Sequence, residues 1–482
     1  MTKKFFIPWI VLITSLNAFG ADRFIVQYKN DERSSQHFAL PRDSILFDLQ
    51  TISKRHGLYT VRFPLGLGPK GIHDQLNLLR SLPGVEDALV DRVVTQRTQM
   101  GGFPNDSFQK TPIQKSPTDF GHLQWNLQRA GPQNPGSTDA ESAWDEFGTD
   151  GVDAYGREIV VAVVDSGFDL AHEDLVDNFF VNTGEIPGNG LDDDSNGYVD
   201  DFVGWSLSKK GPLPHQVTSD FHGTHVAGIV GARGGDGVGV SGVNWNVKIL
   251  PVQLAQKSGR DRQLFISQMI TAYTYIMDMK RQWLSSEGLE GANIVATNTS
   301  IGINSVHCKG KDHSIWDKLY DEMGSLGIVS VVAVANRSYN IDERGDIPAT
   351  CTSEYIISVS SIDRDGHLGG LSAWGPSSVD LLAPGMPIYS TAPHSAYRFG
   401  AGTSVAAPHV SGAVAYLYSV AHENFIELYD TAPEKAALTV KKILLDSTFP
   451  MPELVERVAT GGRLDLYRAA KRIYGYGTAE SL

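Results

Sequence analysis

Residues 159–167 read Ile-Val-Val-Ala-Val-Val-Asp-Ser-Gly, six apolar residues followed at once by a carboxylate and a small-residue turn. A run without polar alternation predicts a strand covered on both faces, as in a parallel sheet between helices. Asp165 follows this run directly, and open parallel sheets bind ligands at the carboxyl ends of their strands. The stretch therefore predicts an α/β domain with a functional carboxylate at one edge of its sheet.

The chain beyond residue 121 repeats this pattern. Segments with helical periodicity, 263–283 and 314–323, alternate with further apolar runs at 247–252, 293–296, 328–334 and 355–359. Strands that alternate with helices favour a parallel sheet flanked by helices.

Two more polar residues lie in distinctive strings. His222 opens His-Gly-Thr-His-Val-Ala-Gly, and Ser404 lies in Gly-Thr-Ser-Val-Ala-Ala-Pro-His at the start of a helical pattern. Taken singly, a strand-end Asp, a packed His and an N-cap Ser are all ordinary structural residues. Together they follow the order Asp, His, Ser, which is one of three known orders of a catalytic triad and is that of subtilisin.

From about Gln124 to about Ala470 the chain resembles the subtilases, a family of serine proteases with an α/β fold. The resemblance implies that Ser404 attacks the scissile carbonyl, that His222 carries the proton, and that Asp165 orients the imidazole. Of the other histidines in the strings, His225 is predicted to be a packing residue on the helix face, and His409 has no role in the motif.

The same resemblance also implies an oxyanion donor and a substrate-binding strand. Asn336 ends the run 331–336 and would donate to the oxyanion, while Ala335 stands where subtilases usually have Gly and adds a methyl group near the P1 pocket. Backbone groups of Ser300 and Gly302, in the segment 298–302, would pair with the substrate as an added strand. No charged residue is identified at the P1 pocket, so we expect a broad or apolar preference.

The first twenty residues have the features of a secretory leader. Lys3 and Lys4 precede an apolar stretch over 5–16, and Ala-Phe-Gly at 18–20 suits cleavage before Ala21. The apolar stretch is too short to span a bilayer comfortably. We predict a signal peptide over 1–20 and a secreted protein, extracellular or periplasmic, without a stable membrane anchor; an uncleaved anchor is the alternative.

Residues 21–98 have the pattern of a small α+β domain. Strand-like segments at 24–28, 58–63 and 85–94 accompany apolar residues at 72, 76, 79 and 82, which predict a helix. The pattern is similar to the ferredoxin-like inhibitory prodomains of subtilases. This likeness implies an intramolecular inhibitor whose tail, 91–100, lies in the active site, with self-cleavage between about residues 94 and 102. A linker or processing region over 99–120 and a catalytic domain over 121–475 follow; a permanent accessory domain is the alternative to a prodomain.

An acidic stretch predicts structural calcium. Residues 192–201 contain five Asp, and Asp192, Asp194 and Asn196 alternate before a Gly as in an EF-hand loop, although Val203 replaces the last Glu. Asp200 is a further candidate ligand. The family resemblance implies another site at Asp174, nine residues after Asp165, with Asp236. We predict no organic cofactor; a solvated acidic turn is the alternative to calcium.

Charge and cysteine content limit the remaining functions. With 41 basic and 55 acidic residues the formal net charge is −14, which argues against a nucleic-acid binder. Cys308 and Cys351 could form one disulfide in an exported protein or remain as two free thiols.

We predict a monomeric zymogen of an endopeptidase that cuts proteins or peptides. A catalytically silent peptide-binding protein is the alternative; a lipase of the α/β-hydrolase type would need Gly-x-Ser-x-Gly and a different residue order.

Overall fold

The computed structural model describes residues 23–28, 48–53, 55–63, 69–82, 84–97, 114–115, 121–214, 221–254, 264–309 and 314–478. The chain forms two compact units, Met1–Arg92 and Val93–Leu482. The predicted leader and most of the predicted linker lie outside the described residues.

The first unit contains a four-stranded antiparallel sheet of order β2-β3-β1-β4. Its elements are β1 (Arg23–Tyr28), β2 (Asp48–Ser53), β3 (Leu58–Arg62), α1 (Pro69–Ser81) and β4 (Val85–Val90). Phe24, Val61 and Leu79 are buried in one small core that joins the sheet to the helix. The expected α+β domain is confirmed, and its strand order is that of a ferredoxin-like sheet.

The prediction of a single strand over 85–94 is wrong, because two separate strands occupy this segment. β4 ends at Val90, and the buried Asp91 forms an ion pair with Arg23 at 3.0 Å. The next strand, β5 (Val93–Gln96), belongs to the second unit and pairs with strands there. Apolar content alone did not reveal this break, since both strands are rich in valine.

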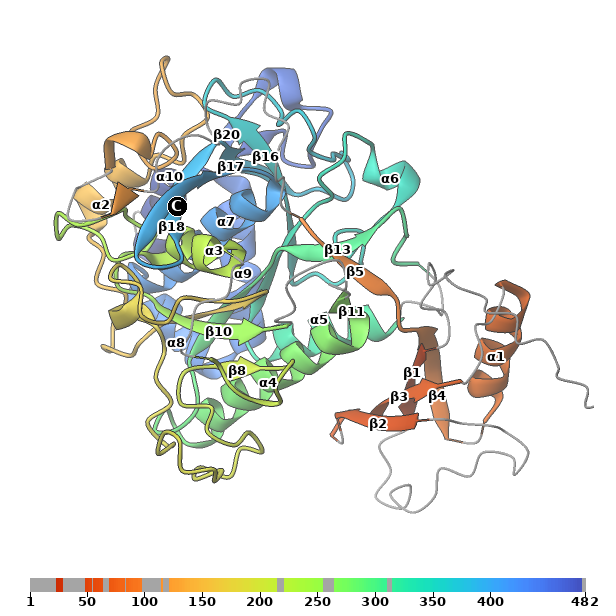
Figure 1. The fold of residues 1–482 in the computed structure, drawn as a ribbon. Coiled ribbons are helices and arrows are strands. Elements are labelled where there is room, and N and C mark those ends of the chain that lie inside the picture. Colours follow the sequence, from red (N-terminus) through yellow and green to blue (C-terminus); the bar gives the residue numbers. More distant parts are fainter. Residues whose placement is uncertain are drawn as a thin grey trace, which may run out of the picture. The chain divides into compact units, whose positions relative to one another are not determined.

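A ten-stranded, mostly parallel sheet forms the centre of the second unit (Figure 1). Its order is β20-β21-β17-β16-β14-β12-β7-β10-β8-β9, and only the pairs at its two ends are antiparallel. The strands are β7 (Val160–Asp165), β8 (Trp205–Ser206), β9 (Gly211–Pro212), β10 (Lys248–Gln253), β12 (Ile294–Thr299), β14 (Val329–Ala333), β16 (Ile356–Asp363), β17 (Leu381–Met386), β20 (Phe449–Pro450) and β21 (Gly462–Arg463).

Every apolar run singled out beyond residue 121 lies in this sheet. β7, β10, β12 and β14 are almost completely buried, as expected for strands covered on both faces. The parallel sheet flanked by helices that these runs predict is confirmed, and it agrees with the subtilisin-like α/β fold that the family resemblance implies.

Helices flank the sheet and bring distant segments of the chain together. The helix α7 contacts β12, β14, β16 and β17, and it also packs along α3. The helices of this unit are α2 (Ala140–Phe147), α3 (His222–Gly231), α4 (Ile266–Ser285), α5 (Ser314–Ser325), α6 (Ile341–Arg344), α7 (Thr403–Ser419), α8 (Glu423–Thr431), α9 (Pro433–Asp446) and α10 (Leu466–Tyr474). Among the helices of the described ranges, none combines the length and the apolar character needed to cross a bilayer.

Two smaller sheets complete the second unit. One has the order β11-β5-β13-β15, and the other has the order β18-β19-β6. Their strands are β5, β6 (Gln114–Lys115), β11 (Leu264–Phe265), β13 (Ile301–Asn304), β15 (Asp346–Ile347), β18 (Ile388–Ala392) and β19 (Ala396–Gly400). β6 lies inside the segment predicted to be a linker, and it pairs with β19.

Candidate active site

Asp165 and His222 face each other across the carboxyl end of the central sheet. Asp165 is the last residue of β7, and His222 is the first residue of α3. The imidazole Nδ1 lies 2.7 Å from Oδ1 and 2.8 Å from Oδ2 of the carboxylate, and both residues are buried. Ser166 donates its backbone N–H to Asp165 Oδ1 at 2.6 Å, which helps to fix the carboxylate. A proton held on Nδ1 by Asp165 makes Nε2 the basic nitrogen of the ring.

Ser404 is the second residue of α7, and its hydroxyl is fully buried. Within the described part of the chain, its Oγ has no hydrogen-bond partner. Ser300 donates its hydroxyl to the backbone carbonyl of Ser404 at 3.0 Å, so the segment between β12 and β13 is tied to the start of α7. A hydroxyl at a helix N-terminus lies beside free backbone N–H groups, which can stabilise a developing negative charge.

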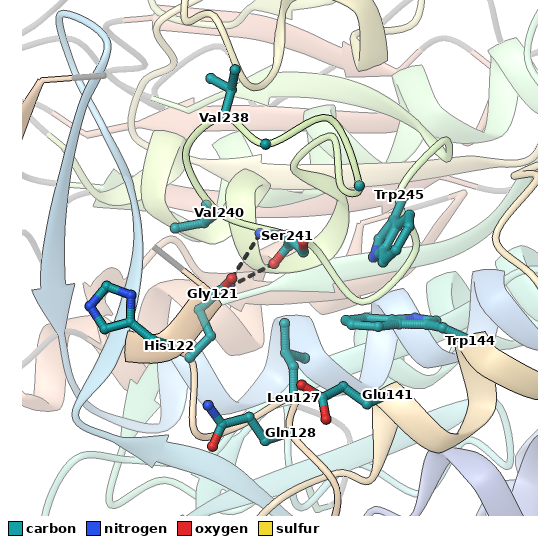
Figure 2. A pocket seen from close by; sticks show the side chains of 13 residues that line it. Gly121, His122, Leu127, Gln128, Glu141, Trp144, Val238, Val240, Ser241 and Trp245 are labelled. Carbon is teal, nitrogen blue, oxygen red and sulfur yellow. Dashed lines mark hydrogen bonds between the residues drawn. The ribbon is translucent and has the colours of Figure 1, made fainter. Parts of the chain in front are cut away.

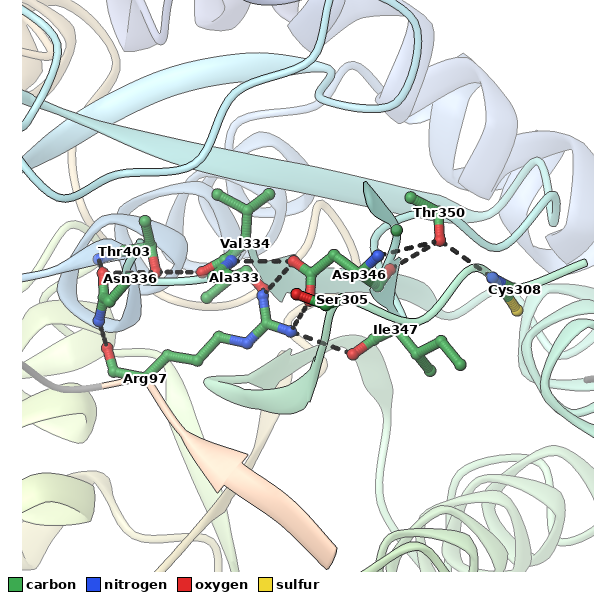
Figure 3. A network of polar contacts seen from close by, with 12 residues as sticks. Arg97, Ser305, Cys308, Ala333, Val334, Asn336, Asp346, Ile347, Thr350 and Thr403 are labelled. Carbon is green, nitrogen blue, oxygen red and sulfur yellow. Dashed lines mark hydrogen bonds and ion pairs between the residues drawn. The ribbon is translucent and has the colours of Figure 1, made fainter. Parts of the chain in front are cut away.

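Asn336 is held by the residue that precedes Ser404. Its Oδ1 accepts hydrogen bonds from the N–H of Thr403 at 2.9 Å and from the Thr403 hydroxyl at 3.1 Å. This orientation leaves Nδ2 to donate, and Nδ2 binds the backbone carbonyl of Arg97 (Figure 3). A peptide carbonyl therefore lies on the side chain that the sequence predicts to be the oxyanion donor.

Gly402 leaves the space for this arrangement. Its φ is +123°, in the region that favours glycine, and a Cβ there would lie 2.7 Å from Asn336 Nδ2 and 3.1 Å from the Arg97 carbonyl oxygen. The close approach of these atoms places the Arg97 carbonyl beside the turn that leads into Ser404.

The chain's own segment Val93–Arg97 occupies the predicted substrate position. β5 lies between β11 and β13 and is antiparallel to both. Thr95 is paired with Gly302, and the N–H of Arg97 donates to the Ser300 carbonyl at 3.0 Å. Both residues predicted to pair with a substrate thus pair with an extended peptide.

His225 and His409 contribute packing. Burial lowers the pKa of His225 to about 3, with a further contribution from His222, and its Nε2 lies 3.2 Å from the Arg398 carbonyl oxygen. Burial also lowers the pKa of His409 to about 4. Both rings are therefore neutral near pH 7. This agrees with a packing role for His225 in α3 and for His409 in α7.

The acidic stretch brings together a different group of carboxylates from the predicted one. Carboxylate oxygens of Glu185, Asp194 and Asp201 lie within 4.8 Å of one another. Of the predicted ligands, only Asp194 belongs to this group. Glu185 and Asp201 are buried, the Glu185 Oε2 has no hydrogen-bond partner among the described residues, and burial raises the pKa of Asp201 to about 6. Buried, unneutralised carboxylates of this kind fit a hard cation such as calcium.

The other predicted residues of this stretch are bonded to the loop itself. Asp192 accepts the N–H groups of Asn196 at 3.0 Å and Gly197 at 2.9 Å. Asp200 accepts three backbone N–H groups, from residues 188 to 190. Asn196 donates its amide to Asp194 Oδ2 at 3.1 Å. Glu185 lies outside the motif, so the spacing within the loop does not reveal it. Asp201 lies within the acidic stretch, but the alternating motif does not include it.

Asp174 lies in a second place that fits a cation. It is buried, its Oδ2 accepts the N–H of Val240 at 2.8 Å, and its Oδ1 has no partner within the described ranges. Burial raises the pKa of Asp174 to about 8, and the negative charge of Asp236 adds to the effect.

Val240 also lines a cavity of about 610 Å³, together with Val238, Ser241 and the two indoles of Trp144 and Trp245 (Figure 2). None of the predicted catalytic residues lines this cavity. It is therefore distinct from the candidate active site.

Cys308 and Cys351 form a disulfide, so the two cysteines are not free thiols. The bond joins positions 43 residues apart, with a Cα–Cα distance of 4.7 Å. Thr350, next to Cys351, accepts the N–H of Cys308 on its hydroxyl at 3.1 Å. The bridge thus connects the segment after β13 to the segment after β15.

Replacing both cysteines with serine is expected to lower the free energy of unfolding by about 4 kcal/mol, because a bridge over such a loop restricts the unfolded chain. Denaturant unfolding of the parent and of the double variant measures the change. Reduction of the parent with dithiothreitol should give a similar decrease. Equal unfolding midpoints in all three samples would contradict the expectation.

A comparison with protein families matches residues 156–477 of the chain to the subtilase family. Subtilisin-like protease 1 of Plasmodium vivax is 29% identical over 328 residues, which are 64% of this chain and 46% of that protein. The extracellular basic protease of Dichelobacter nodosus is 27% identical over 428 residues, 84% of this chain and 64% of that protein. The chain thus spans about half the length of the Plasmodium relative.

Solved structures show the same fold. The epidermin leader peptide processing serine protease of Staphylococcus aureus, in a mutant form, has a TM-score of 0.60 at 18% identity and covers 93% of this chain and 98% of its own. Fervidolysin of Fervidobacterium pennivorans, described as a keratinolytic enzyme related to subtilisin, has a TM-score of 0.57 at 20% identity; the match covers 93% of this chain and 61% of fervidolysin.

Proposed function

Because the chain belongs to the subtilase family of serine proteases, we propose that it is an exported serine endopeptidase made as a zymogen. The observation that carries the proposal is the peptide carbonyl of Arg97, which accepts the Asn336 side-chain amide beside the turn into Ser404. A backbone segment held on the substrate strand with its carbonyl on this donor has the geometry of a protease substrate.

Each residue has a chemical task in the proposed reaction. Ser404 Oγ forms a bond to the scissile carbonyl carbon while His222 Nε2 takes the hydroxyl proton. The negative charge that develops on the carbonyl oxygen is stabilised by Asn336 Nδ2 and the Ser404 backbone N–H. His222 then gives its proton to the leaving amine as the C–N bond breaks, and water hydrolyses the acyl-enzyme by the same route.

Asp165 acts throughout on the histidine. Its two oxygens lie within hydrogen-bond distance of Nδ1, so the carboxylate fixes the tautomer and stabilises the imidazolium when the ring is protonated. The Ser166 side chain also donates to Asp165 Oδ1 at 3.1 Å, and in the precursor the Gln96 side chain donates to the same oxygen at 3.4 Å.

The zymogen part of the proposal rests on residues 93–97. These residues lie within the predicted tail of an inhibitory prodomain, 91–100, and they fill the strand position that a substrate would need. Such a segment inhibits by competition until it is cut and released. The disulfide supports export, because disulfides persist in oxidising compartments and are rare in the cytosol.

Labelling with a serine-directed fluorophosphonate tests the proposal against the silent peptide-binding alternative. The mature protein should be labelled at Ser404 and should hydrolyse unfolded casein, and the labelled protein should lose this activity. A mature protein that binds peptides but neither reacts with the probe nor cuts casein would support the silent binding protein instead.

Calcium is the proposed structural ion. Glu185, Asp194 and Asp201 would hold it, and Asp174 with Asp236 is a second candidate group. The ion would neutralise carboxylates that are buried in the folded chain, and it would take no part in bond cleavage.

Calcium is expected to raise the melting temperature by several degrees, since a ligand that binds only the folded state adds about 2.7 kcal/mol at a concentration 100-fold above its Kd. Thermal unfolding in calcium and in chelator measures the difference. Asp201→Asn should reduce it, whereas Asp192→Asn, a matched change in the same loop, should reduce it less because Asp192 accepts backbone N–H groups. Equal melting temperatures of the parent protein in calcium and in chelator would refute the calcium site.

A further inference from the structure

The Arg97 side chain is buried, although it is long and cationic. Only 2% of its surface is exposed. Burying a guanidinium is costly unless a partner of opposite charge and further hydrogen-bond acceptors surround it. The residues that contact the Arg97 side chain therefore indicate which kind of side chain this position can bind.

Asp346 meets the guanidinium with both carboxylate oxygens. Arg97 Nη1 donates to Oδ2 at 2.6 Å, and Nη2 donates to Oδ1 (Figure 3). Nη1 also donates to the Ala333 carbonyl, and Nη2 donates to the Ile347 carbonyl at 3.0 Å. Two parallel bonds to one carboxylate match the planar fork of arginine and cannot be made by lysine.

The Asp346 carboxylate is held in place from several sides. It is fully buried, and its Oδ2 also accepts the N–H of Ala335 at 2.9 Å. β15, which begins at Asp346, pairs with the end of β13, and Thr350 donates its hydroxyl to the Asp346 carbonyl at 2.8 Å. Among the described residues, Arg97 is the only cation in an ion pair with Asp346.

The backbone of Arg97 identifies its place in the candidate active site. Its N–H is bonded to the Ser300 carbonyl, and its own carbonyl accepts Asn336 Nδ2. The residue whose carbonyl lies on the oxyanion donor is the one on the amino side of the bond to be cut, so Arg97 is at P1 and Asp346 lies at the end of the P1 pocket.

We propose that this protease cuts after arginine, that Asp346 selects the P1 guanidinium, and that its first substrate is its own chain on the carboxyl side of Arg97. The inference rests on the proposed function and narrows it to a substrate class. In the first turnover the bond from the Arg97 carbonyl to the nitrogen of Thr98 breaks, and that nitrogen leaves with the proton from His222.

A preference for arginine at P1 differs from the broad or apolar preference expected from the sequence. Gly302 helps to explain how the pocket admits a long side chain, because a Cβ at this position would lie 1.9 Å from Arg97 Nη2. Asp346 belongs to no motif, and it faces Arg97 only because β15 pairs with β13. The sequence thus carried no local signal for an acidic pocket.

The first experiment compares fluorogenic amides of Val-Thr-Gln-Arg, Val-Thr-Gln-Lys and Val-Thr-Gln-Leu on the mature enzyme. Losing one partner of a buried charge pair is costly, so kcat/KM should be about 100-fold higher for the arginine peptide than for the leucine peptide, with lysine between them. Asp346→Asn should reduce the ratio at least tenfold. Asp365→Asn removes the same charge from an exposed turn and should keep the ratio.

Each rate is referred to the concentration of Ser404 that reacts with fluorophosphonate, so a poorly folded variant cannot imitate a change in specificity. Equal rates on arginine and leucine in the parent enzyme would overturn the inference. An unchanged ratio in Asp346→Asn would also overturn it. A chain that neither reacts with the probe nor cuts any peptide would refute the proposed function itself, and this inference with it.

The second experiment needs no change in the mature enzyme. The parent should mature to a chain that begins at Thr98, and Arg97→Leu should slow this cut about 100-fold in a time course followed by intact mass. Arg92→Leu, the same substitution at an exposed position five residues earlier, should mature at the parent rate. Maturation of Arg97→Leu at the parent rate, or a parent chain that begins elsewhere, would contradict cleavage after Arg97.

Discussion

Ser404→Ala is expected to leave the exported chain near full length, starting around Ala21, because the proposed cut depends on the chain's own nucleophile. Loss of a triad serine typically lowers kcat by about 10⁶-fold. The docking of residues 93–97 depends on strand pairing and on the Asn336 contact, not on the hydroxyl, so the precursor should still fold. Intact mass of the variant, made in a protease-deficient host, measures the outcome.

His222→Ala should block maturation to nearly the same extent, because the members of a triad act as a unit. Asp165→Asn should mature slowly, since loss of the aspartate typically costs less than loss of either other member. A Ser404→Ala product of mature length would show that another protease makes the cut, and self-activation would have to be abandoned.

Asn336→Ala is expected to lower kcat by about 10² to 10³-fold while the fold is retained, because one preorganised donor to the oxyanion is lost. The substitution should change kcat more than KM, since the charge on the carbonyl oxygen develops only in the transition state. Steady-state rates on the best peptide substrate, referred to labelled Ser404, measure both constants.

Asn246→Ala is the matched control for this variant. Asn246 is exposed and donates its amide to the Thr149 carbonyl at 2.7 Å, outside the candidate active site. Its kcat should equal that of the parent. Equal kcat values in Asn336→Ala and Asn246→Ala would remove Asn336 from the reaction.

The sequence predicted the elements that depend on neighbouring residues. The run 159–164 became the buried strand β7, and the helical pattern after residue 402 became α7. In contrast, β2 (Asp48–Ser53) was not predicted, because the sequence Asp-Leu-Gln-Thr-Ile-Ser has no apolar run. β2 pairs along the whole length of β3, so it becomes a strand through its partner.

The sequence also placed the candidate catalytic residues at the ends of such elements. Asp165 ends a strand, while His222 and Ser404 lie at the beginnings of helices. Each of these residues is positioned by a local pattern that a motif can encode. The pairing of Asp165 with His222 follows once those elements pack on one sheet.

The tertiary structure alone decided which charges meet. Arg97 and Asp346 are 249 positions apart, and they face each other only because β5, β13 and β15 lie side by side in one sheet. Glu185 likewise joins Asp194 and Asp201 through folding of the loop and not through spacing. Periodicity and motifs record the local preferences of the chain. Strand pairing between distant segments brings Arg97 onto Asp346, and folding of one loop assembles the candidate cation group. Both processes bring together side chains that no local pattern connects.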